Sequence, residues 1–511
     1  MKKQQVVVLL ASLLILSACA IVYELLISTV STYLLGSSVL HFSITIGLFL
    51  SFLGVGAYLS RYLTGSLLPK FILIEFVLSL AGGYSAALLY IGNAWFPNYY
   101  LLLFGVIAMI GTLAGMEIPL VTRLLEKEGS LRDVISRVLA FDYLGALAAS
   151  LAFPLLMLPL LGSMRAAFFT GLINWSVAAM NLWVFRDQLP RPRILIGSAA
   201  VGLFALVGGF IYSFQLVSFA DALHYQDQVV LRKQTPYQKL VVTRWNDDLR
   251  LYINGNLQFS SVDEYRYHEA LVHIPMLAAQ RRSDVLVLGG GDGLALREIL
   301  KYPDVRRVDV VDLDAGMVEL ARINPLFTQL NQGALDDPRV RLIYEDAFNY
   351  VKNCSKRYNV ILIDLPDPSE PALGKLYSTA FYRMVRQICA ADGVAATQST
   401  APFLARAAFW CIHHTMSEAF EQVLPYQAYV PSFGLWGFQL AVPNRMPPAA
   451  LQARIQSNLL PFVQDLRFLT VQNIPSCFVF DKDTAPLDVP VNTLETMQLV
   501  RLYEASYIQF H

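Results

Sequence analysis

The first 220 residues contain seven apolar segments, each long enough to cross a lipid bilayer as a helix, which takes about 20 residues. Charged residues are scarce there: residues 1–220 hold 20 of the chain's 78 Lys, Arg, Asp and Glu. Because lipid offers no hydrogen-bond partners, the backbone of each segment must be helical. The segments are approximately Val6–Ser28, Phe42–Ser60, Phe71–Gly92, Tyr99–Leu120, Tyr143–Leu161, Ala166–Phe185 and Ile194–Phe214. The sequence therefore predicts a multi-pass α-helical membrane domain over residues 1–220, in contact with membrane lipid.

Three acids, Glu24, Glu75 and Glu117, lie inside these apolar segments, and Asp142 lies at the edge of another. Carboxylates are costly in a bilayer and often mark a functional site. A hydrogen bond between two helices, or a side chain that reaches the membrane surface, explains them equally well. If they face a common cavity, that cavity would suit a cation.

Positive residues near short loops favour the cytoplasmic side of a membrane. With seven spans, one side collects 11 Lys and Arg and the other side collects only Arg165. The N-terminus is therefore predicted to be cytoplasmic in a multi-pass cell-membrane protein. An odd number of spans would then place the following domain outside the cytoplasm, so the side of that domain stays open.

The second half of the chain has the pattern of a soluble protein. Residues 221–280 read as short strands around turns, and Asn254–Gly255 is a strong signal for a β-hairpin. From residue 281 to 511, strands alternate with helices, which predicts a parallel sheet and an α/β domain. The formal net charge of the chain is zero, so no bulk electrostatic attraction to nucleic acid is expected.

Acidic residues follow four consecutive strands of the predicted parallel sheet. The first strand leads into the glycine turn "GGGDG", which contains Asp292 where a phosphate-binding turn would avoid negative charge. Asp312 lies 19 residues after Gly293, a spacing that suits a carboxylate on a ribose. Ligands of open parallel sheets bind outside the carboxyl ends of the strands. We therefore expect Asp292, Asp312, Asp314, Asp346, Asp364 and Asp367 to converge on one crevice that attracts a cationic ligand, such as a sulfonium nucleoside or an amine.

Several motifs occur in an order that resembles the spermidine synthases, or polyamine aminopropyltransferases. They are "YQKL", "NGNLQFSSVDEYRYHE", "GGGDGLALRE", "VVDLDAGMVELAR", "DDPRV", "EDAF" and "DLPDPSEPALGKLYS". The preceding apolar half is similar to the bacterial membrane-fused branch of that family. The resemblance implies a small β-domain at 221–280 and a Rossmann-like, methyltransferase-type domain at 281–511. It also implies transfer of an aminopropyl group from decarboxylated S-adenosylmethionine, a co-substrate, to putrescine or a related polyamine, with no cofactor and no metal.

The resemblance also implies residue roles. Asp364 matches the family's proton acceptor, Asp367 matches a second acid near the substrate amines, and Asp292 matches the acid on the aminopropyl amine. Asp312 matches the ribose-binding acid and Asp346 the adenine-binding acid. Four more positions match those that line the donor and amine pocket: Gln238, Gln258, Tyr267 and His268.

Two departures from the family pattern concern the ligands. Asp312 stands where the family usually has Glu, and Asp also binds ribose hydroxyls. Phe433 in "VPSFGLWGF" stands where soluble relatives usually carry a Tyr beside the amine. Phe cannot hydrogen-bond an ammonium group, so the acceptor amine is less well defined than the donor.

Two other functions remain open from the sequence. One is an S-adenosylmethionine-type methyltransferase, although Asp292 would repel the carboxylate of that donor. The other is a polyamine-binding membrane sensor or transporter with a non-catalytic soluble domain. The five cysteines show no metal-ligand spacing, and "CIHH" at Cys411–His414 reads as helix packing. Whether the chain forms a homodimer is left open.

Overall fold

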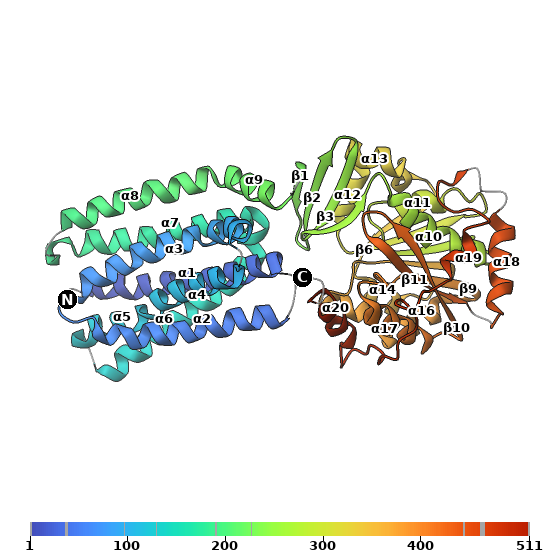
Figure 1. The fold of residues 1–511 in the computed structure, drawn as a ribbon. Helices are drawn as coiled ribbons and strands as arrows, with labels where there is room; N and C mark the ends of the chain where they lie inside the picture. Colours follow the sequence, from blue (N-terminus) through green and yellow to red (C-terminus); the bar gives the residue numbers. More distant parts are fainter. Residues whose placement is uncertain are drawn as a thin grey trace. The chain divides into compact units, whose positions relative to one another are not determined.

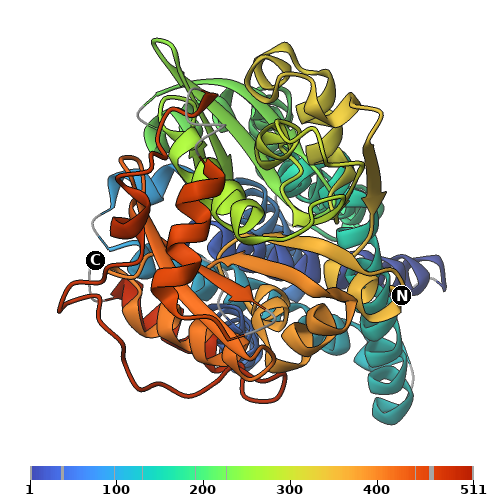
Figure 2. The same ribbon diagram turned by 90° about the vertical axis from the view of Figure 1, so that its right-hand side faces the viewer.

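The computed structural model describes residues 3–35, 39–96, 98–128, 130–189, 192–225, 227–442, 445–459 and 465–508. The chain divides into two compact units, Met1–Val229 and Val230–His511. Figure 1 labels their elements and Figure 2 gives a second view. The predicted fold class is confirmed: a helical N-terminal region is followed by a small sheet and a Rossmann-like sheet domain.

The first unit is entirely helical in its described part up to β1. Its α-helices are α1 (Lys3–Leu35), α2 (Val39–Leu59), α3 (Leu67–Trp95), α4 (Tyr99–Gly115), α5 (Glu117–Leu125), α6 (Leu131–Ala152), α7 (Leu158–Val184), α8 (Pro192–Ile211) and α9 (Ser213–His224). Within the described residues, five helical stretches are long and apolar enough to cross a membrane, and a bent pair, Leu195–Ile211 with Ser213–Ala220, makes a sixth candidate.

The fifth stretch, Leu131–Val184, contains two of the seven predicted segments. A straight helix of its 54 residues would measure about 81 Å, far more than the roughly 30 Å of a bilayer core. Gly162 breaks it with a left-handed φ of 69°. Val134 and Leu182, near its two ends, share one apolar cluster, whereas Phe153 and Met164, in its middle, share another. The stretch therefore reverses direction near its middle, and its two halves each run along the length of the helical unit.

The buried acid Glu75 has a partner on another helix. Its carboxyl group on α3 accepts a hydrogen bond of 2.8 Å from Nδ2 of Asn174 on α7. Both side chains are fully buried. The two helices can come this close because Gly171 of α7 lies against Gly83 and Ser79 of α3, where even a methyl group would collide. For Glu75, the structure thus shows a hydrogen bond between helices.

The small sheet of the second unit contains β1 (Gln228–Gln234), β2 (Lys239–Trp245), β3 (Asp248–Ile253) and β4 (Asn256–Ser260), in the order β1-β2-β3-β4. Asn254 and Gly255 form the predicted tight turn between β3 and β4, and both have positive φ, at 49° and 86°. The helical unit continues past the predicted boundary at residue 220, because α9 ends only at His224.

The large sheet has seven strands in the order β10-β11-β9-β8-β5-β6-β7. The five strands from β9 to β7 are parallel, and β11 and β10 add antiparallel pairs at one edge. The order reverses between β5 and β8, which is where open α/β sheets bind ligands. The strands are β5 (Asp284–Gly289), β6 (Arg307–Asp312), β7 (Val340–Tyr344), β8 (Tyr358–Asp364), β9 (Cys389–Gln398), β10 (Gln422–Val430) and β11 (Gly434–Val442).

Helices cover both faces of this sheet (Figure 2). Alternate residues of a strand point to opposite faces, and both faces here are apolar. On β5, Val285 and Val287 belong to one buried cluster and Leu286 and Leu288 to another. The first cluster includes residues of α10 (Glu264–Ala278), α11 (Leu294–Ile299), α12 (Ala315–Ile323), α13 (Pro325–Asn331), α18 (Pro448–Leu459) and α19 (Ile474–Cys477). The second includes residues of α14 (Ala347–Asn353), α16 (Thr379–Ile388), α17 (Arg406–Ser417) and α20 (Gln498–Ile508), near the short helix α15 (Pro371–Gly374).

Candidate active site

Four neighbouring parallel strands, β8, β5, β6 and β7, end at one edge of the large sheet, and each is followed by an acid. Asp364 is the last residue of β8 and Asp312 is the last residue of β6. Asp292 follows β5 in the turn before α11, and Asp346 follows β7 as the N-cap of α14. The structure therefore brings the predicted acids to one edge, because parallel strands share the direction of their carboxyl ends.

The glycine turn after β5 connects the acids through its backbone. The amide of Gly290 donates to the carbonyl of Asp364 over 3.2 Å, and the amide of Gly291 donates to Oδ2 of Asp312 over 3.1 Å. Gly289 and Gly290 have φ of 84° and 65°, which other residues adopt only with strain. A side chain at Gly289 would also collide with the carbonyl of Asp364. The turn thus needs glycine both for its conformation and for close approach to two strand ends.

Asp292 has a structural role as well as a place at the sheet edge. Its Oδ1 accepts a hydrogen bond of 2.9 Å from the amide of Leu294, at the start of α11. Burial raises the pKa of its carboxyl group, although the charge of His268 and the bond from Leu294 act in the opposite direction. The group would therefore gain from a bound cation, which stabilises the ionised form.

Asp364 is held by a phenol from α10. The hydroxyl of Tyr267 donates to its Oδ1 over 2.6 Å, a charge-assisted bond of the kind worth about 1.5–3 kcal/mol. The Tyr267 ring packs against Trp436, with centroids 6.3 Å apart, and Trp436 packs against Phe433 at 5.1 Å. Burial and the charge of Asp292 raise the pKa of Asp364 to about 6, while His268 and the Tyr267 hydrogen bond oppose the increase.

His268 lies next in sequence to Tyr267 but has a different environment. It is 3 % exposed, and its Nδ1 lies 2.7 Å from Oε2 of Glu264. Glu264 also forms an ion pair of 2.8 Å with Arg297. Burial favours neutral imidazole, but the hydrogen bond and charge of Glu264, with the charges of Asp292 and Asp364, raise the pKa of His268 to about 9. These interactions favour the protonated form of His268, whose positive charge acts on two of the predicted site acids, Asp292 and Asp364.

Asp367 follows β8 by three residues and is held from two directions. Its Oδ1 lies 3.3 Å from Nε2 of Gln398 at the end of β9, and its Oδ2 accepts a 2.7 Å hydrogen bond from the hydroxyl of Tyr503 on α20. Burial raises the pKa of Asp367 to about 6, although both hydrogen bonds oppose the increase. Neither donor belongs to a motif that the sequence singled out.

Asp312 and Asp346 are held mainly by backbone amides. Asp312 accepts bonds from Gly291 and from Asp314, the latter over 2.8 Å. Burial, with the charges of Asp314 and Asp292, raises its pKa to about 6. Asp346 accepts a bond from the amide of Asn349, at the start of α14, and forms an ion pair of 2.9 Å with Lys375.

The two predicted glutamines differ in how they relate to the acids. Gln238 donates from Nε2 to Oδ2 of Asp314 over 2.8 Å, so it joins the end of β6. Gln258 lies on β4, and its described hydrogen bond runs to the carbonyl of Asn256 on the same strand. The described contacts thus bring Gln238, but not Gln258, to the strand-end acids. Asp314, the residue that Gln238 contacts, is visible in the sequence as part of the strand end "DLD".

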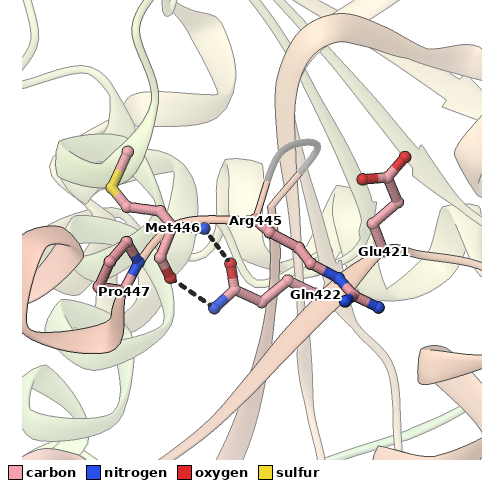
Figure 3. A pocket seen from close by; sticks show the side chains of 5 residues that line it. All are labelled: Glu421, Gln422, Arg445, Met446 and Pro447. Atoms are coloured by element: carbon pink, nitrogen blue, oxygen red, sulfur yellow. Dashed lines mark hydrogen bonds between the residues drawn. The ribbon is translucent and has the colours of Figure 1, made fainter.

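Two pockets lie away from this edge. One, of about 420 Å³, is lined by Glu421, Gln422, Arg445, Met446 and Pro447; Figure 3 shows the Gln422 amide paired with the backbone of Met446. Another, of about 460 Å³, is lined by Tyr265, Glu269, Arg297, Glu298, Lys301, Gln332, Asp465 and Arg467. Neither pocket is lined by a strand-end acid. Both are lined by acidic and basic side chains together, and these do not form a recognisable catalytic group.

Metal-ligand geometry is not found in the described part of the chain: it contains no group of three or more His, Cys, Asp or Glu side chains placed to hold a metal ion. In the "CIHH" segment of α17, His413 contacts Oε1 of Gln439 and His414 contacts the carbonyl of Val489. Cys411 is fully buried. The segment therefore packs as a helix face.

The fold and the acidic sheet edge together define a Rossmann-like domain with a group of acids at the carboxyl ends of its parallel strands. Residues 264–452 match the spermine/spermidine synthase domain family. A polyamine aminopropyltransferase of Leptospira interrogans is 42% identical over 496 residues, which cover 97% of this chain and 98% of that protein. Polyamine aminopropyltransferase 2 of Ralstonia nicotianae is 43% identical over 511 residues, with 98% of each chain covered. The chain belongs to the polyamine aminopropyltransferase family, and it is an aminopropyltransferase.

Among solved structures, the chain is similar to a spermidine synthase crystallised with the transition-state analogue AdoDATO, with a TM-score of 0.47, 25% identity, and coverage of 50% of this chain and 86% of that chain. It is also similar to the spermidine synthase of Thermotoga maritima, with a TM-score of 0.46, 25% identity, and coverage of 50% and 85%.

Proposed function

We propose that this enzyme transfers the aminopropyl group of decarboxylated S-adenosylmethionine to putrescine, giving spermidine and methylthioadenosine. The observation that carries the proposal is the group of buried acids at the sheet edge. Burial raises the pKa of Asp292, Asp312, Asp364 and Asp367. A ligand with several positive charges stabilises the ionised form of each acid. The donor carries a sulfonium and an ammonium group, and the acceptor is a diamine.

The donor fits the carboxyl ends of the three neighbouring strands β5, β6 and β7. Asp312 binds the ribose hydroxyls, Asp346 binds the adenine, and Asp292 binds the ammonium group of the aminopropyl chain. This arrangement uses the glycine turn as the floor of the donor site, since the turn separates Asp292 from Asp312 and has no side chains of its own at Gly290 and Gly291. An intact S-adenosylmethionine carries a carboxylate at the chain end, and Asp292 would repel it.

The acceptor reacts beside Asp364. A free alkylamine is mostly protonated at neutral pH, because its pKa is about 10, and only the neutral amine is a nucleophile. Asp364 takes one proton from the ammonium group, and the electron pair that this frees on nitrogen forms the bond to the carbon beside the sulfonium. The carbon–sulfur bond breaks, its electron pair stays on sulfur, and the sulfonium becomes the neutral thioether of methylthioadenosine. Asp367 holds the second ammonium group of the diamine.

Three features of Asp364 support its role as the base. Tyr267 occupies Oδ1, which leaves Oδ2 for the proton. Gly290 lies beside Oδ2, since a methyl group there would stand 3.3 Å from that oxygen. General bases work best when their pKa lies near the working pH, and a pKa of about 6 meets this condition better than that of an exposed Asp. None of these steps requires a cofactor or a metal ion.

We also propose that the helical unit anchors the enzyme in the cell membrane, in contact with lipid. Apolar side chains on its surface support this, among them Leu101, Leu160, Trp183, Val201 and Phe204, each more than two-thirds exposed. Exposed patches of this kind are unusual on soluble proteins. Family membership favours aminopropyl transfer over the methyltransferase and non-catalytic alternatives.

A panel of amines tests the acceptor assignment. The purified full-length chain is incubated with decarboxylated S-adenosylmethionine and, separately, putrescine, cadaverine, spermidine and agmatine, and the products are identified by mass. We expect the highest kcat/KM with putrescine, and a product heavier than putrescine by one aminopropyl group. If another amine gives a higher kcat/KM than putrescine, that amine is the preferred acceptor and the assignment of putrescine is wrong. Absence of product with every amine would overturn the proposed function.

A further inference from the structure

The C-terminal helix α20 contacts the acid that the proposed function assigns to the acceptor amine. Tyr503 of α20 donates its phenolic hydrogen to Oδ2 of Asp367 over 2.7 Å, across 136 residues of sequence. It lies 51 residues beyond the end of the family-domain match at residue 452. The recognisable synthase domain therefore does not include one of the two side chains that hold Asp367.

Helix α20 is fixed to the loop after β8 by buried groups. Nδ2 of the fully buried Asn492 donates to the carbonyls of Gly374 and Tyr377, over 2.8 and 3.2 Å. Its Oδ1 accepts from the amide of Leu499 in α20. The side chain of Val500 packs so closely on Gly374 that a methyl group there would lie 2.6 Å from it. These contacts determine where Tyr503 stands relative to the segment from Asp364 to Tyr377.

The other donor to Asp367 belongs to a separate, rigid network. Nε2 of Gln398 contacts Asp367 and also donates to the carbonyl of Leu365 over 2.6 Å and to the hydroxyl of Tyr377 over 2.7 Å. Gln398 therefore shares its amide among three acceptors, and its contact with Asp367 is the longest of them at 3.3 Å. The shorter bond from Tyr503 is the stronger constraint on the orientation of this carboxylate.

Tyr503 and Phe433 differ in their hydrogen-bonding groups. The hydroxyl of Tyr503 donates its one hydrogen to Asp367. At Phe433, by contrast, the side chain offers no hydrogen-bonding group, and its ring packs against Trp436. The chain thus has a phenol on α20 next to Asp367 and none at Phe433.

We propose that α20 is part of the acceptor-amine subsite, with Tyr503 as the positioning residue that orients the Asp367 carboxylate toward the ammonium group of the acceptor. This inference rests on the proposed function, because that function assigns the amine to Asp367. Its consequence is that acceptor selectivity depends on the C-terminal segment outside the domain match.

The test measures steady-state kinetics of the full-length chain with Tyr503→Phe, which keeps the ring and removes the hydroxyl. Losing one hydrogen bond to a charged group costs roughly a factor of ten, so we expect the KM for putrescine to rise about tenfold. The KM for the donor should stay within about twofold of wild type. Since the Tyr503 hydrogen bond favours the ionised form of Asp367, the acid limb of kcat/KM for putrescine should also move to higher pH.

Two further variants separate positioning from general stability. Tyr350→Phe removes a phenol that is hydrogen-bonded to Tyr358, at the opposite end of β8 from Asp364, and should leave the KM for putrescine unchanged. Tyr503→3-fluorotyrosine keeps the ring and the hydroxyl but makes the phenol a stronger donor, so the acid limb should move to lower pH. The two substitutions at Tyr503 therefore have opposite expected shifts, which loss of packing cannot produce.

Three results would overturn the inference. The first is a Tyr503→Phe enzyme with wild-type KM for putrescine and a wild-type pH profile, while Asp367→Asn loses acceptor affinity; this would leave the proposed function intact. The second is an equal rise in KM for donor and acceptor, which indicates a general loss of structure. The third is an Asp367→Asn enzyme that binds putrescine normally. A wild-type chain that is inactive with every amine would instead overturn the proposed function itself.

Discussion

Asp364 and Asp367 lie three residues apart, yet different parts of the chain hold them. Tyr267 of α10 bonds to Asp364, whereas Tyr503 of α20 bonds to Asp367. Burial raises the pKa of each acid to about 6. The two carboxyl groups can thus take separate tasks, one in proton transfer and the other in holding an ammonium group.

The pH dependence of turnover follows from these pKa values. A base works only when it is deprotonated, so activity should fall as the pH drops below about 6, the pKa of Asp364 and Asp367. Below this point the rate should fall about tenfold per pH unit for one essential carboxylate and more steeply for two. The measurement is kcat/KM from about pH 3 to pH 8. An acid limb centred near 4, the ordinary value for Asp, would show that burial does not tune these acids.

The group of aromatic rings beside Asp364 leads to a second prediction. Phe433 contacts Trp436, which contacts Tyr267. Replacing Phe433 by Tyr adds a hydroxyl that can accept a hydrogen bond from an ammonium group. We expect Phe433→Tyr to lower the KM for putrescine or to change the order of preferred amines, measured with the amine panel. Identical kinetics with every amine would show that this ring does not face the acceptor.

Individual residues differ in how well the sequence predicts them. The strand-end acids could be predicted because strand ends are visible in the hydrophobic pattern, and parallel strands converge. The buried ion pair of Glu264 with Arg297 could not, since it depends on how α10 packs against α11. Tyr503 gives no local signal, because its partner is 136 residues away. Motifs therefore predict the site residues that lie within them, but not the residues elsewhere in the chain that hold those site residues in place.

At the scale of elements, the turn between β5 and α11 positions the proposed donor site. Its backbone donates to Asp312 and to the carbonyl of Asp364. A methyl group at Gly291 would lie 2.5 Å from Oδ2 of Asp312. Asp312 cannot move aside without losing its bonds to Gly291 and Asp314. The shape of the turn and the orientation of the proposed ribose acid are therefore linked.

The substitution Gly291→Ala tests this link. The methyl group should displace the Asp312 carboxylate and raise the KM for the donor about tenfold, equivalent to about 1.4 kcal/mol. The KM for putrescine should change little, because Asp367 is held by Gln398 and Tyr503. Gly208→Ala, at a helical position with nothing within 4 Å of the new methyl group, is the matched control. If the Gly291→Ala enzyme has the same KM for the donor as wild type, Asp312 does not have its proposed role in binding the donor.

Helices and strands were predicted well where the hydrophobic period is strong. The glycine turn and the Asn254–Gly255 hairpin appear as predicted. The break at Gly162 lies between the predicted segments Tyr143–Leu161 and Ala166–Phe185. The π-helical segment Phe153–Met157 lies inside the first of them and gives no separate signal, because Pro is tolerated in membrane helices.

At the scale of the whole molecule, the apolar clusters of the helical unit bear on its membrane topology. Leu9 of α1 and Leu125 of α5 belong to one cluster, together with Leu189 before α8. Leu206 in the second half of α8 belongs to the other cluster. The start of α1 and the end of α8 therefore lie at opposite ends of the helical unit. This agrees with an odd number of passes, which would place the two ends of the helical unit on opposite sides of a membrane.

Reporter fusions decide on which side the catalytic domain lies. If the helical unit makes seven passes with a cytoplasmic N-terminus, alkaline phosphatase fused after His511 should be active, because it folds only outside the cytoplasm. A cytoplasmic reporter at the same position, such as green fluorescent protein, should then be dark. The reverse result, a silent phosphatase with a bright fluorescent fusion, would exclude the seven-pass arrangement with an outside catalytic domain.

Asp364 carries the central claim, and a single comparison tests it. Wild type and Asp364→Asn are incubated with decarboxylated S-adenosylmethionine and putrescine, and spermidine and methylthioadenosine are quantified by mass spectrometry. We predict equal amounts of the two products with wild type, and turnover lower by about 10²-fold or more with Asp364→Asn, as expected for loss of a general base. The donor should still bind the variant, since Asp292, Asp312 and Asp346 remain. Near-normal turnover with Asp364→Asn, or wild-type activity only with intact S-adenosylmethionine, would contradict the account.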